Sequence, residues 1–126
     1  MVSTAGDYMR FSMMLLNGGE LDGVRLLSRK TVEYMASDHV GALANGPSFF
    51  PGPGYGFGLG FAVRTAPGMA AIPSSVGEYN WGGAAGTAFW IDPKEKLVAI
   101  FLMQAPGQRI FYRFAFRSLV YQSIVD

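Results

Sequence analysis

The sequence predicts an α+β fold, an antiparallel sheet of three or four strands with helices on its faces. Residues 4–16 and 108–125 carry apolar side chains at helical spacing, whereas residues 55–103 form short apolar or alternating runs separated by turn residues. The short turn at 92–95 suits neighbouring antiparallel strands. No repeat or linker divides residues 1–126, so a single domain is expected.

The first predicted helix has a clear start and a clear end. Thr4 can cap its N-terminus, and Asp7, three residues later, suits the positive end of the helix dipole. Asn17-Gly18-Gly19 tolerates the left-handed backbone that ends many helices. The helix is therefore expected between these two signals.

The segments that follow are predicted from turn and cap residues. Residues 20–27 indicate a tight hairpin, with Asp22-Gly23 typical of a type I′ turn. Ser28 is expected to cap a second helix from Arg29 to about Asp38. Residues 39–54 are rich in glycine and proline and predict a long loop.

The clearest predicted strand runs from Tyr55 to Thr65, where large side chains alternate with glycine or alanine. Glycine inside a strand costs stability, so another backbone is expected to lie close against this strip. Further strands are expected at Val76–Asn80, Thr87–Ile91 and Lys96–Met103, the last covered on both faces because it lacks polar alternation. A terminal helix is expected from Gln108 to Val125.

Composition excludes several classes of protein. The chain is 50% hydrophobic, too apolar for a disordered segment, and its net charge of +1 gives no footprint for nucleic acid or an anionic membrane. The absence of cysteine excludes a disulfide framework and a thiol nucleophile. Charged residues make up 15%, against a usual value of about 25%. This deficit predicts apolar surface that packs against a larger fold or a second copy.

A self-contained active site is not evident. His39 is the single histidine and phosphate-loop spacing is absent, so neither a metal nor a cofactor is expected. Asp38 and His39 are adjacent at a helix end, where their side chains point apart, which favours a helix-terminal histidine over a catalytic dyad. Arg109, Arg113 and Arg117 form one stripe, for which a solvated face is favoured over an anion site.

The segment Tyr79–Thr87 leaves two interpretations open. Trp81 precedes Gly82 and Gly83 near the end of a predicted strand. Such glycines let a ligand or a second backbone approach, and the bare strand edge can expose N–H groups to a developing oxyanion. Glycine-rich strand corners also serve packing alone.

The order of several segments carries more information than any one motif. The ordered set comprises Ser3–Phe11, Leu15–Gly19, Leu26–Ser28, Tyr55–Phe61, Trp81–Gly83 and Asp92–Lys94. This set strongly resembles the C-terminal part of the serine β-lactamase-like hydrolases, which include penicillin-binding-protein-like enzymes. The nearer branch is similar to the class C-related family VIII esterases, and the similarity covers essentially the whole chain.

The resemblance implies the C-terminal part of a β-lactamase/transpeptidase-like fold and roles for particular residues. Trp81-Gly82-Gly83 matches one form of a triplet on the strand that borders the active site, so these residues are expected to bind substrate. The Ala84 N–H is expected to be one oxyanion-hole donor, with the other on the nucleophilic serine. Trp81 stands where a lysine would attract a β-lactam carboxylate, which favours esters or other acyl substrates over penicillins.

Two motifs of the family have no match in this sequence. Ser-x-x-Lys, which carries the nucleophile and base, and Tyr-x-Asn precede this region in the family, and neither occurs here. The chain is therefore expected to be a partial domain, either a C-terminal fragment or a truncated product beginning at Met1. It is expected to be inactive alone, because no acyl-enzyme forms without the serine.

Two functions remain open at this point. The first is the C-terminal part of a serine acyl hydrolase, whose expected partners are a small acyl or ester substrate and the missing N-terminal part or a second copy. The alternative is a non-catalytic, self-associating interaction module that uses the aromatic strand and its loops. Neither nucleic acid nor a membrane is expected as a partner.

Overall fold

The structure is a computed structural model that describes residues 2–45 and 51–125. Its elements in chain order are α1 (Ala5–Leu16), β1 (Glu20–Leu21), β2 (Val24–Arg25), α2 (Arg29–Met35), η1 (Gly41–Asn45), β3 (Tyr55–Phe57), β4 (Ala62–Arg64), β5 (Tyr79–Gly82), β6 (Ala88–Asp92), β7 (Leu97–Phe101), η2 (Pro106–Gln108) and α3 (Arg109–Gln122). The predicted loop at 39–54 begins with the short helix η1, and its residues 46–50 lie outside the described residues.

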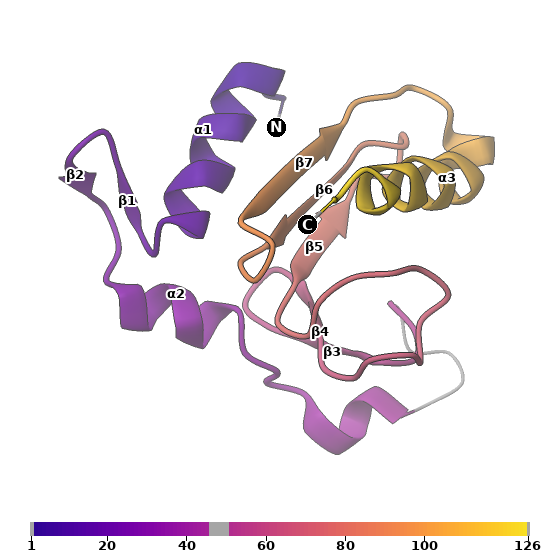
Figure 1. Cartoon of the computed structure of the whole chain (residues 1–126), viewed down its shortest axis with the longest axis horizontal. Helices are drawn as coiled ribbons and strands as arrows, with labels where there is room; N and C mark the ends of the chain where they lie inside the picture. Colours follow the sequence, from indigo (N-terminus) through magenta and orange to yellow (C-terminus); the bar gives the residue numbers. More distant parts are fainter. Residues whose placement is uncertain (1, 46–50, 126) are drawn as a thin grey trace.

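The main sheet has five antiparallel strands that lie in sequence order, β3-β4-β5-β6-β7, while β1 and β2 form a separate hairpin. The predicted α+β class and antiparallel sheet are confirmed. The expected number of strands is too low, because one predicted strand is two. Figure 1 shows α1 and α3 on opposite sides of the sheet, next to β7.

The single strand expected at Tyr55–Thr65 is wrong, because the segment folds back on itself as β3 and β4. The reversal lies at Gly58 to Gly60, where Gly60 adopts a φ of +96°, a conformation that favours glycine. A Cβ at Gly58 would overlap the carbonyl oxygen of Met35. The expected close approach of another backbone therefore occurs at Gly58, but it belongs to a turn.

The local signals near the start of the chain are confirmed. The Asp7 N–H donates to the Thr4 side chain at 3.1 Å, and Asn17 caps the other end of α1. Asp22 and Gly23 have φ values of +52° and +77°, which a type I′ turn requires.

Helix α2 ends at Met35, short of the expected end at Asp38. Its start is as predicted, since Ser28 accepts the N–H of Thr31 at 3.0 Å. The Asp38 carboxylate instead accepts backbone N–H groups of the following loop and of Phe57 in β3. These bonds compete with continuation of the helix, so the chain turns away here.

Strand alternation divides the apolar side chains between two layers. On the α1 side, Leu15 packs with Phe89 and Ile91 in the main buried cluster. On the other side, the Trp90 ring lies 5.7 Å from that of Phe116 and 6.5 Å from that of Tyr121, both on α3. The prediction that the last strand is covered on both faces is confirmed, since α1 and α3 both contact β7.

The arginine stripe of α3 faces the sheet, so the expected solvated face is wrong for two of its members. Arg117 is buried and pairs with the buried Glu78, and Arg113 is half-buried, whereas Arg109 is exposed. The physical reason is that the sheet presents a buried carboxylate and loop carbonyls that need donors. Apolar side chains of α3 are turned to the outside instead, namely Ile110, Phe111, Phe114 and Leu119.

Candidate functional site

The segment singled out by sequence forms the end of β5 and a tight loop that leads into β6. The loop, residues 83–87, is closed by the Gly83 N–H, which donates to the Thr87 carbonyl at 2.8 Å, and by the Gly86 N–H, which donates to the Gly83 carbonyl at 3.2 Å. Gly86 has a φ of +125°, which explains glycine at that position. The loop therefore protrudes from one end of the sheet.

Both glycines after Trp81 make room for side chains of this chain. A Cβ at Gly82 would lie 2.7 Å from the guanidinium carbon of Arg113. A Cβ at Gly83 would overlap the hydroxyl of Thr87. Packing alone thus accounts for both glycines, and their contact with a substrate stays a prediction.

Ala84 lies at the exposed tip of the loop. In the part of the chain that the structure describes, its N–H meets no hydrogen-bond acceptor. Its carbonyl, in contrast, accepts a hydrogen bond from the Arg109 side chain at 3.3 Å. Ala84, Ala85 and Thr87 therefore carry the loop N–H groups that meet no acceptor among the described residues, and an oxyanion role is expected for the one on Ala84.

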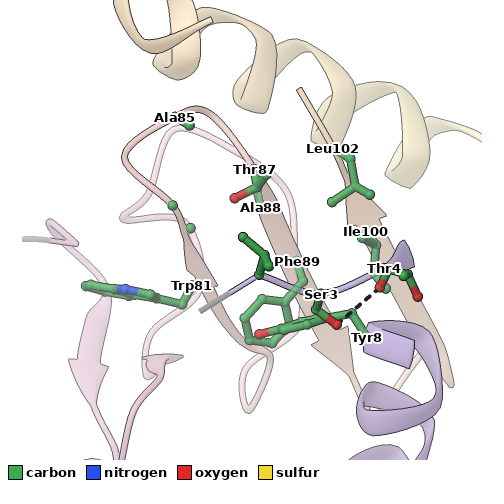
Figure 2. A pocket seen from close by; sticks show the side chains of 13 residues that line it. Ser3, Thr4, Tyr8, Trp81, Ala85, Thr87, Ala88, Phe89, Ile100 and Leu102 are labelled. Carbon is green, nitrogen blue, oxygen red and sulfur yellow. Dashed lines mark hydrogen bonds between the residues drawn. The ribbon is translucent and has the colours of Figure 1, made fainter. Parts of the chain in front are cut away.

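A cavity of about 480 Å³ lies beside this loop, between the start of α1 and the ends of β5, β6 and β7 (Figure 2). It is lined by Val2, Ser3, Thr4, Tyr8, Trp81, Gly82, Gly83, Ala85, Thr87, Ala88, Phe89, Ile100 and Leu102. Most of this lining is apolar, which suits the apolar part of an acyl group. The residues on either side of Ala84 both belong to it.

Tyr8 places a polar group against this apolar lining. Its ring packs edge-on against Phe89, with the centroids 5.0 Å apart. Burial raises the pKa of Tyr8 above its ordinary value, so the hydroxyl stays a neutral donor near pH 7. Figure 2 shows the Tyr8 ring reaching across the cavity toward β5.

A smaller cavity of about 160 Å³ lies on the α3 side of β5. Trp81 and Gly82 line both cavities, so β5 separates them. The second cavity also contacts Arg113, Arg117 and Asn80. The acyl-sized cavity and the arginines of α3 therefore lie on opposite sides of one strand.

A buried polar cluster anchors α3 next to the second cavity. Burial raises the pKa of Glu78 above its ordinary value, even though Arg117 lies beside it. Burial acts to lower the pKa of Arg117, but Glu78, Tyr55 and Tyr121 together raise that pKa above its ordinary value. Asp92, also buried, accepts the hydroxyl of Tyr121 at 2.9 Å. The two carboxylates of the cluster are fully buried, which suits anchoring of α3, while Arg117 also lines the second cavity.

Asp38 and His39 do not form a dyad. The His39 ring nitrogen lies 2.7 Å from the Tyr34 carbonyl. The Asp38 carboxylate is held by backbone N–H groups, which lower its pKa against the opposing effect of burial. The interpretation of His39 as a helix-terminal residue therefore agrees with its contacts.

Two residues near the loop, Arg113 and Tyr8, are not predicted to belong to the site. The sequence favours a solvated face for Arg113 and places Tyr8 in the first predicted helix and in the ordered set of motifs, whereas Thr87 closes the predicted segment Tyr79–Thr87. The spacing of the arginines was a signal for Arg113, but spacing does not tell which face of a helix is buried. Tyr8 joins the site through contact across the sheet, which sequence spacing does not reveal.

Two other features, a metal site and a membrane-spanning helix, are absent from the described residues. No group of three or more His, Cys, Asp or Glu side chains lies close enough to hold a metal ion within residues 2–45 and 51–125. No helix in the described ranges is long and apolar enough to cross a bilayer.

Comparison with known sequences reveals relatives. Protein Rv1367c of Mycobacterium tuberculosis strain H37Rv and the uncharacterized protein MT1414 of strain CDC 1551 are each 40% identical to this chain over 108 residues. The match covers 81% of this chain but 27% of each relative. The chain thus spans about a quarter of the length of these curated relatives.

Solved structures likewise match most of this chain but only part of their own length. EstCE1, a hydrolase with promiscuous acyltransferase activity, has a TM-score of 0.81 at 29% identity, over 94% of this chain and 30% of its own. The unliganded simvastatin synthase LovD from Aspergillus terreus has a TM-score of 0.69 at 23% identity, over 96% of this chain and 35% of its own, and shows a likeness of fold alone.

The expected fold, the C-terminal part of a β-lactamase/transpeptidase-like fold, is confirmed by these matches. The sequence model of the family described as Beta-lactamase matches residues 1–121, which is nearly the whole chain. The ordered motifs, the five-stranded sheet and the relatives thus agree that this chain belongs to the beta-lactamase family.

Proposed function

We propose that this chain forms part of the active site of a serine acyl hydrolase. In this proposal the Ala84 N–H is an oxyanion-hole donor, and Trp81, Gly82 and Gly83 form the adjoining wall of the substrate pocket. The nucleophilic serine is supplied by polypeptide outside this sequence, because Ser-x-x-Lys does not occur here. The substrate is a small ester or other acyl compound.

The observation that carries the proposal is that the Ala84 N–H meets no acceptor among the described residues, while its neighbours Gly83 and Ala85 both line a largely apolar cavity. During acyl transfer, attack on a carbonyl carbon moves negative charge onto the carbonyl oxygen. A fixed N–H aimed at that oxygen stabilises the tetrahedral intermediate more than the ground state. The hydrolase activity of EstCE1, which shares 29% identity, supports the same class of chemistry.

The apolar lining of the cavity favours an uncharged acyl group. Trp81 and its neighbours in the cavity of about 480 Å³ are mostly apolar, and no Lys or Arg among the described residues lines it. An acyl chain therefore gains from burial there, whereas a carboxylate would lose its hydration without a cation to replace it.

The test grafts this chain into a longer relative of stated activity, the hydrolase EstCE1, in place of the matched 30% of its chain. On a nitrophenyl ester that the unaltered relative hydrolyses, the graft is expected to be active and the isolated chain inactive. Hydrolysis by the isolated chain that survives replacement of each serine would contradict the proposal.

The donor itself is tested in the graft by Ala84→Pro, which removes the N–H. Loss of one oxyanion donor typically lowers kcat by about 10²- to 10³-fold. Ala84→Gly retains the N–H and is the matched control, expected to keep most of the activity. Equal rates for the two folded variants, with folding checked by circular dichroism, would rule out the donor role.

A second candidate function is self-association without catalysis. It is favoured by the apolar side chains on the outside of α3, of which Phe111 is 69% and Leu119 64% exposed. Sedimentation velocity of the isolated chain is expected to show association that Phe111→Ser weakens. Leu26→Ser, at a comparably exposed leucine (69%) of the hairpin, is the control. A monomer that binds no apolar dye would contradict this function.

A further inference from the structure

Arg113 makes an unusual set of contacts with the loop that carries Ala84. From α3, its Nε donates to the Gly86 carbonyl at 3.2 Å and its Nη2 donates to the Thr87 carbonyl at 2.7 Å. The same Nη2 also donates to the Gly83 carbonyl. One guanidinium therefore donates hydrogen bonds to three carbonyls of a single loop.

The Gly83 carbonyl accepts hydrogen bonds from both Arg113 and the Gly86 N–H, and these two bonds together fix the direction of the Ala84 N–H. The Gly83 carbonyl and the Ala84 N–H belong to one peptide unit, and a trans peptide is planar, with its C=O and N–H on opposite sides. No described peptide bond is cis. Because Arg113 holds the Gly83 oxygen toward α3, the Ala84 N–H is directed away from α3, where it meets no acceptor.

The charge of Arg113 adds to this effect. A hydrogen bond from a guanidinium to a carbonyl is charge-assisted and polarises the peptide unit. Polarisation of the Gly83 carbonyl makes the N–H at the other side of the same unit a better donor. The contact therefore acts on both the direction and the strength of the donor.

Gly82 provides the space that this contact needs. The guanidinium of Arg113 lies against the Gly82 backbone, and a Cβ there would come within 2.7 Å of the guanidinium carbon and 2.8 Å of Nη2. The side chain would then have to leave the loop. Gly82 and Arg113 thus form one arrangement, built from a strand and a helix that are distant in sequence.

We infer that Arg113 is a positioning residue that orients the Ala84 N–H by holding the Gly83 carbonyl. This inference rests on the proposed function, because orientation of Ala84 matters only if its N–H meets an oxyanion. The competing explanation is purely structural, that Arg113 only joins α3 to the sheet. The two explanations predict different mobility of the Ala84 backbone in a variant that changes Arg113 but keeps the fold.

The experiment measures backbone ¹⁵N order parameters in the full 126-residue chain. Ala84 in the unaltered chain is expected to be as rigid as ordered backbone, with an order parameter of about 0.85, and in Arg113→Lys it is expected to fall below about 0.6. Gly82→Ala displaces the guanidinium from the strand side and is expected to have the same effect. Arg25→Lys is the matched control, because Arg25 also donates to backbone carbonyls, those of Gly18 and Leu27, and it is expected to leave Ala84 rigid.

A purely structural role predicts a lower melting temperature without greater motion at Ala84. An unchanged order parameter at Ala84 in folded Arg113→Lys would therefore overturn the inference. If both variants fail to fold, the test uses the unaltered chain and measures rotation of the Arg113 guanidinium. Separate NMR signals for the two Nη groups indicate slow rotation and agree with the inference. Free rotation of the guanidinium overturns it.

The graft described above separates this inference from the proposed function. There, Arg113→Lys is expected to lower kcat by about 10- to 100-fold with little change in KM, as for a misplaced catalytic group. If Ala84 becomes mobile but the graft with native Arg113 hydrolyses no ester, the proposed function fails and the positioning contact stands. If the graft is active and insensitive to Arg113, the positioning inference fails alone.

Discussion

Replacing Arg117 by methionine would leave the Glu78 carboxylate buried without its cation. The two side chains are 8% and 0% exposed, so neither charge can turn to water. The groups that remain next to Glu78 are the Asn80 amide, which donates at 2.9 Å, and the Tyr55 hydroxyl, which donates at 3.4 Å. Both are neutral and cannot replace the guanidinium.

The size of the effect follows from this burial. Removing one partner of a buried ion pair costs about 3–5 kcal/mol, out of a total stability of about 5–15 kcal/mol for a typical domain. Arg117 also lies over the Trp90 ring, 5.3 Å from its centroid. Methionine can keep part of that contact, so the loss of the ion pair dominates.

Urea unfolding at neutral pH, followed by circular dichroism, measures this loss. With a urea dependence of about 1–3 kcal/mol per molar, the midpoint is expected to fall by roughly 2 M. The double variant Glu78→Met with Arg117→Met removes both charges and is expected to recover most of the stability. A loss below about 1 kcal/mol, or a double variant no more stable than Arg117→Met, would refute the reasoning.

The pH dependence has a definite sign. Burial raises the folded-state pKa of Glu78, so its protonated form is favoured by folding and the resulting stability is lost as pH rises through that pKa. Without Arg117 the pKa rises further, because the opposing attraction is gone. The destabilisation by Arg117→Met is therefore expected to be smaller near pH 5 than near pH 8. An equal loss of unfolding free energy at pH 5 and pH 8 would contradict a raised pKa for Glu78.

Two further predictions concern the fold. Gly58→Ala is expected to destabilise by about 1–3 kcal/mol, because its Cβ would overlap the Met35 carbonyl oxygen. Gly107→Ala, where a Cβ meets nothing within 4 Å, is expected to change stability by less than about 0.5 kcal/mol, and equal urea midpoints for the two would contradict the turn geometry. Leu15→Ala, at a side chain 1% exposed, is expected to cost about 2–5 kcal/mol in the same assay, and a smaller loss would place Leu15 outside the core.

Signals that act within a few residues were predicted correctly. The Thr4 and Ser28 caps and the Asp22-Gly23 turn depend on backbone groups that are close in sequence. Each is decided by local geometry before the rest of the chain packs. The single strand expected at Tyr55–Thr65 failed because the glycine alternation hid a turn at Gly58 to Gly60, whose contact with the distant Met35 carbonyl does not follow from sequence spacing.

The candidate site was only partly predictable for a similar reason. Trp81-Gly82-Gly83 could be found because its residue types and order match a family pattern. The sequence did not reveal why residue 82 is a glycine, because the guanidinium that occupies the space of a side chain there belongs to Arg113 on α3. Periodicity placed Arg113 on a stripe, but the partners that turn this stripe inward, Glu78 and the loop carbonyls, are long-range contacts.

The inward arginines connect the core to the candidate site along one helix. Arg113 and Arg117 are four residues apart, so α3 presents them about 6 Å apart along its axis. Arg117 meets Glu78 just before β5, and Arg113 meets Gly83 just after it. Apolar packing tolerates some sliding of a helix, whereas an ion pair with fixed donors and acceptors selects one position, which is the registry role best attested for buried charges. We therefore expect the Glu78–Arg117 pair to set the axial position from which Arg113 reaches the loop, so that the inferred orientation of the Ala84 N–H would also depend on this buried pair.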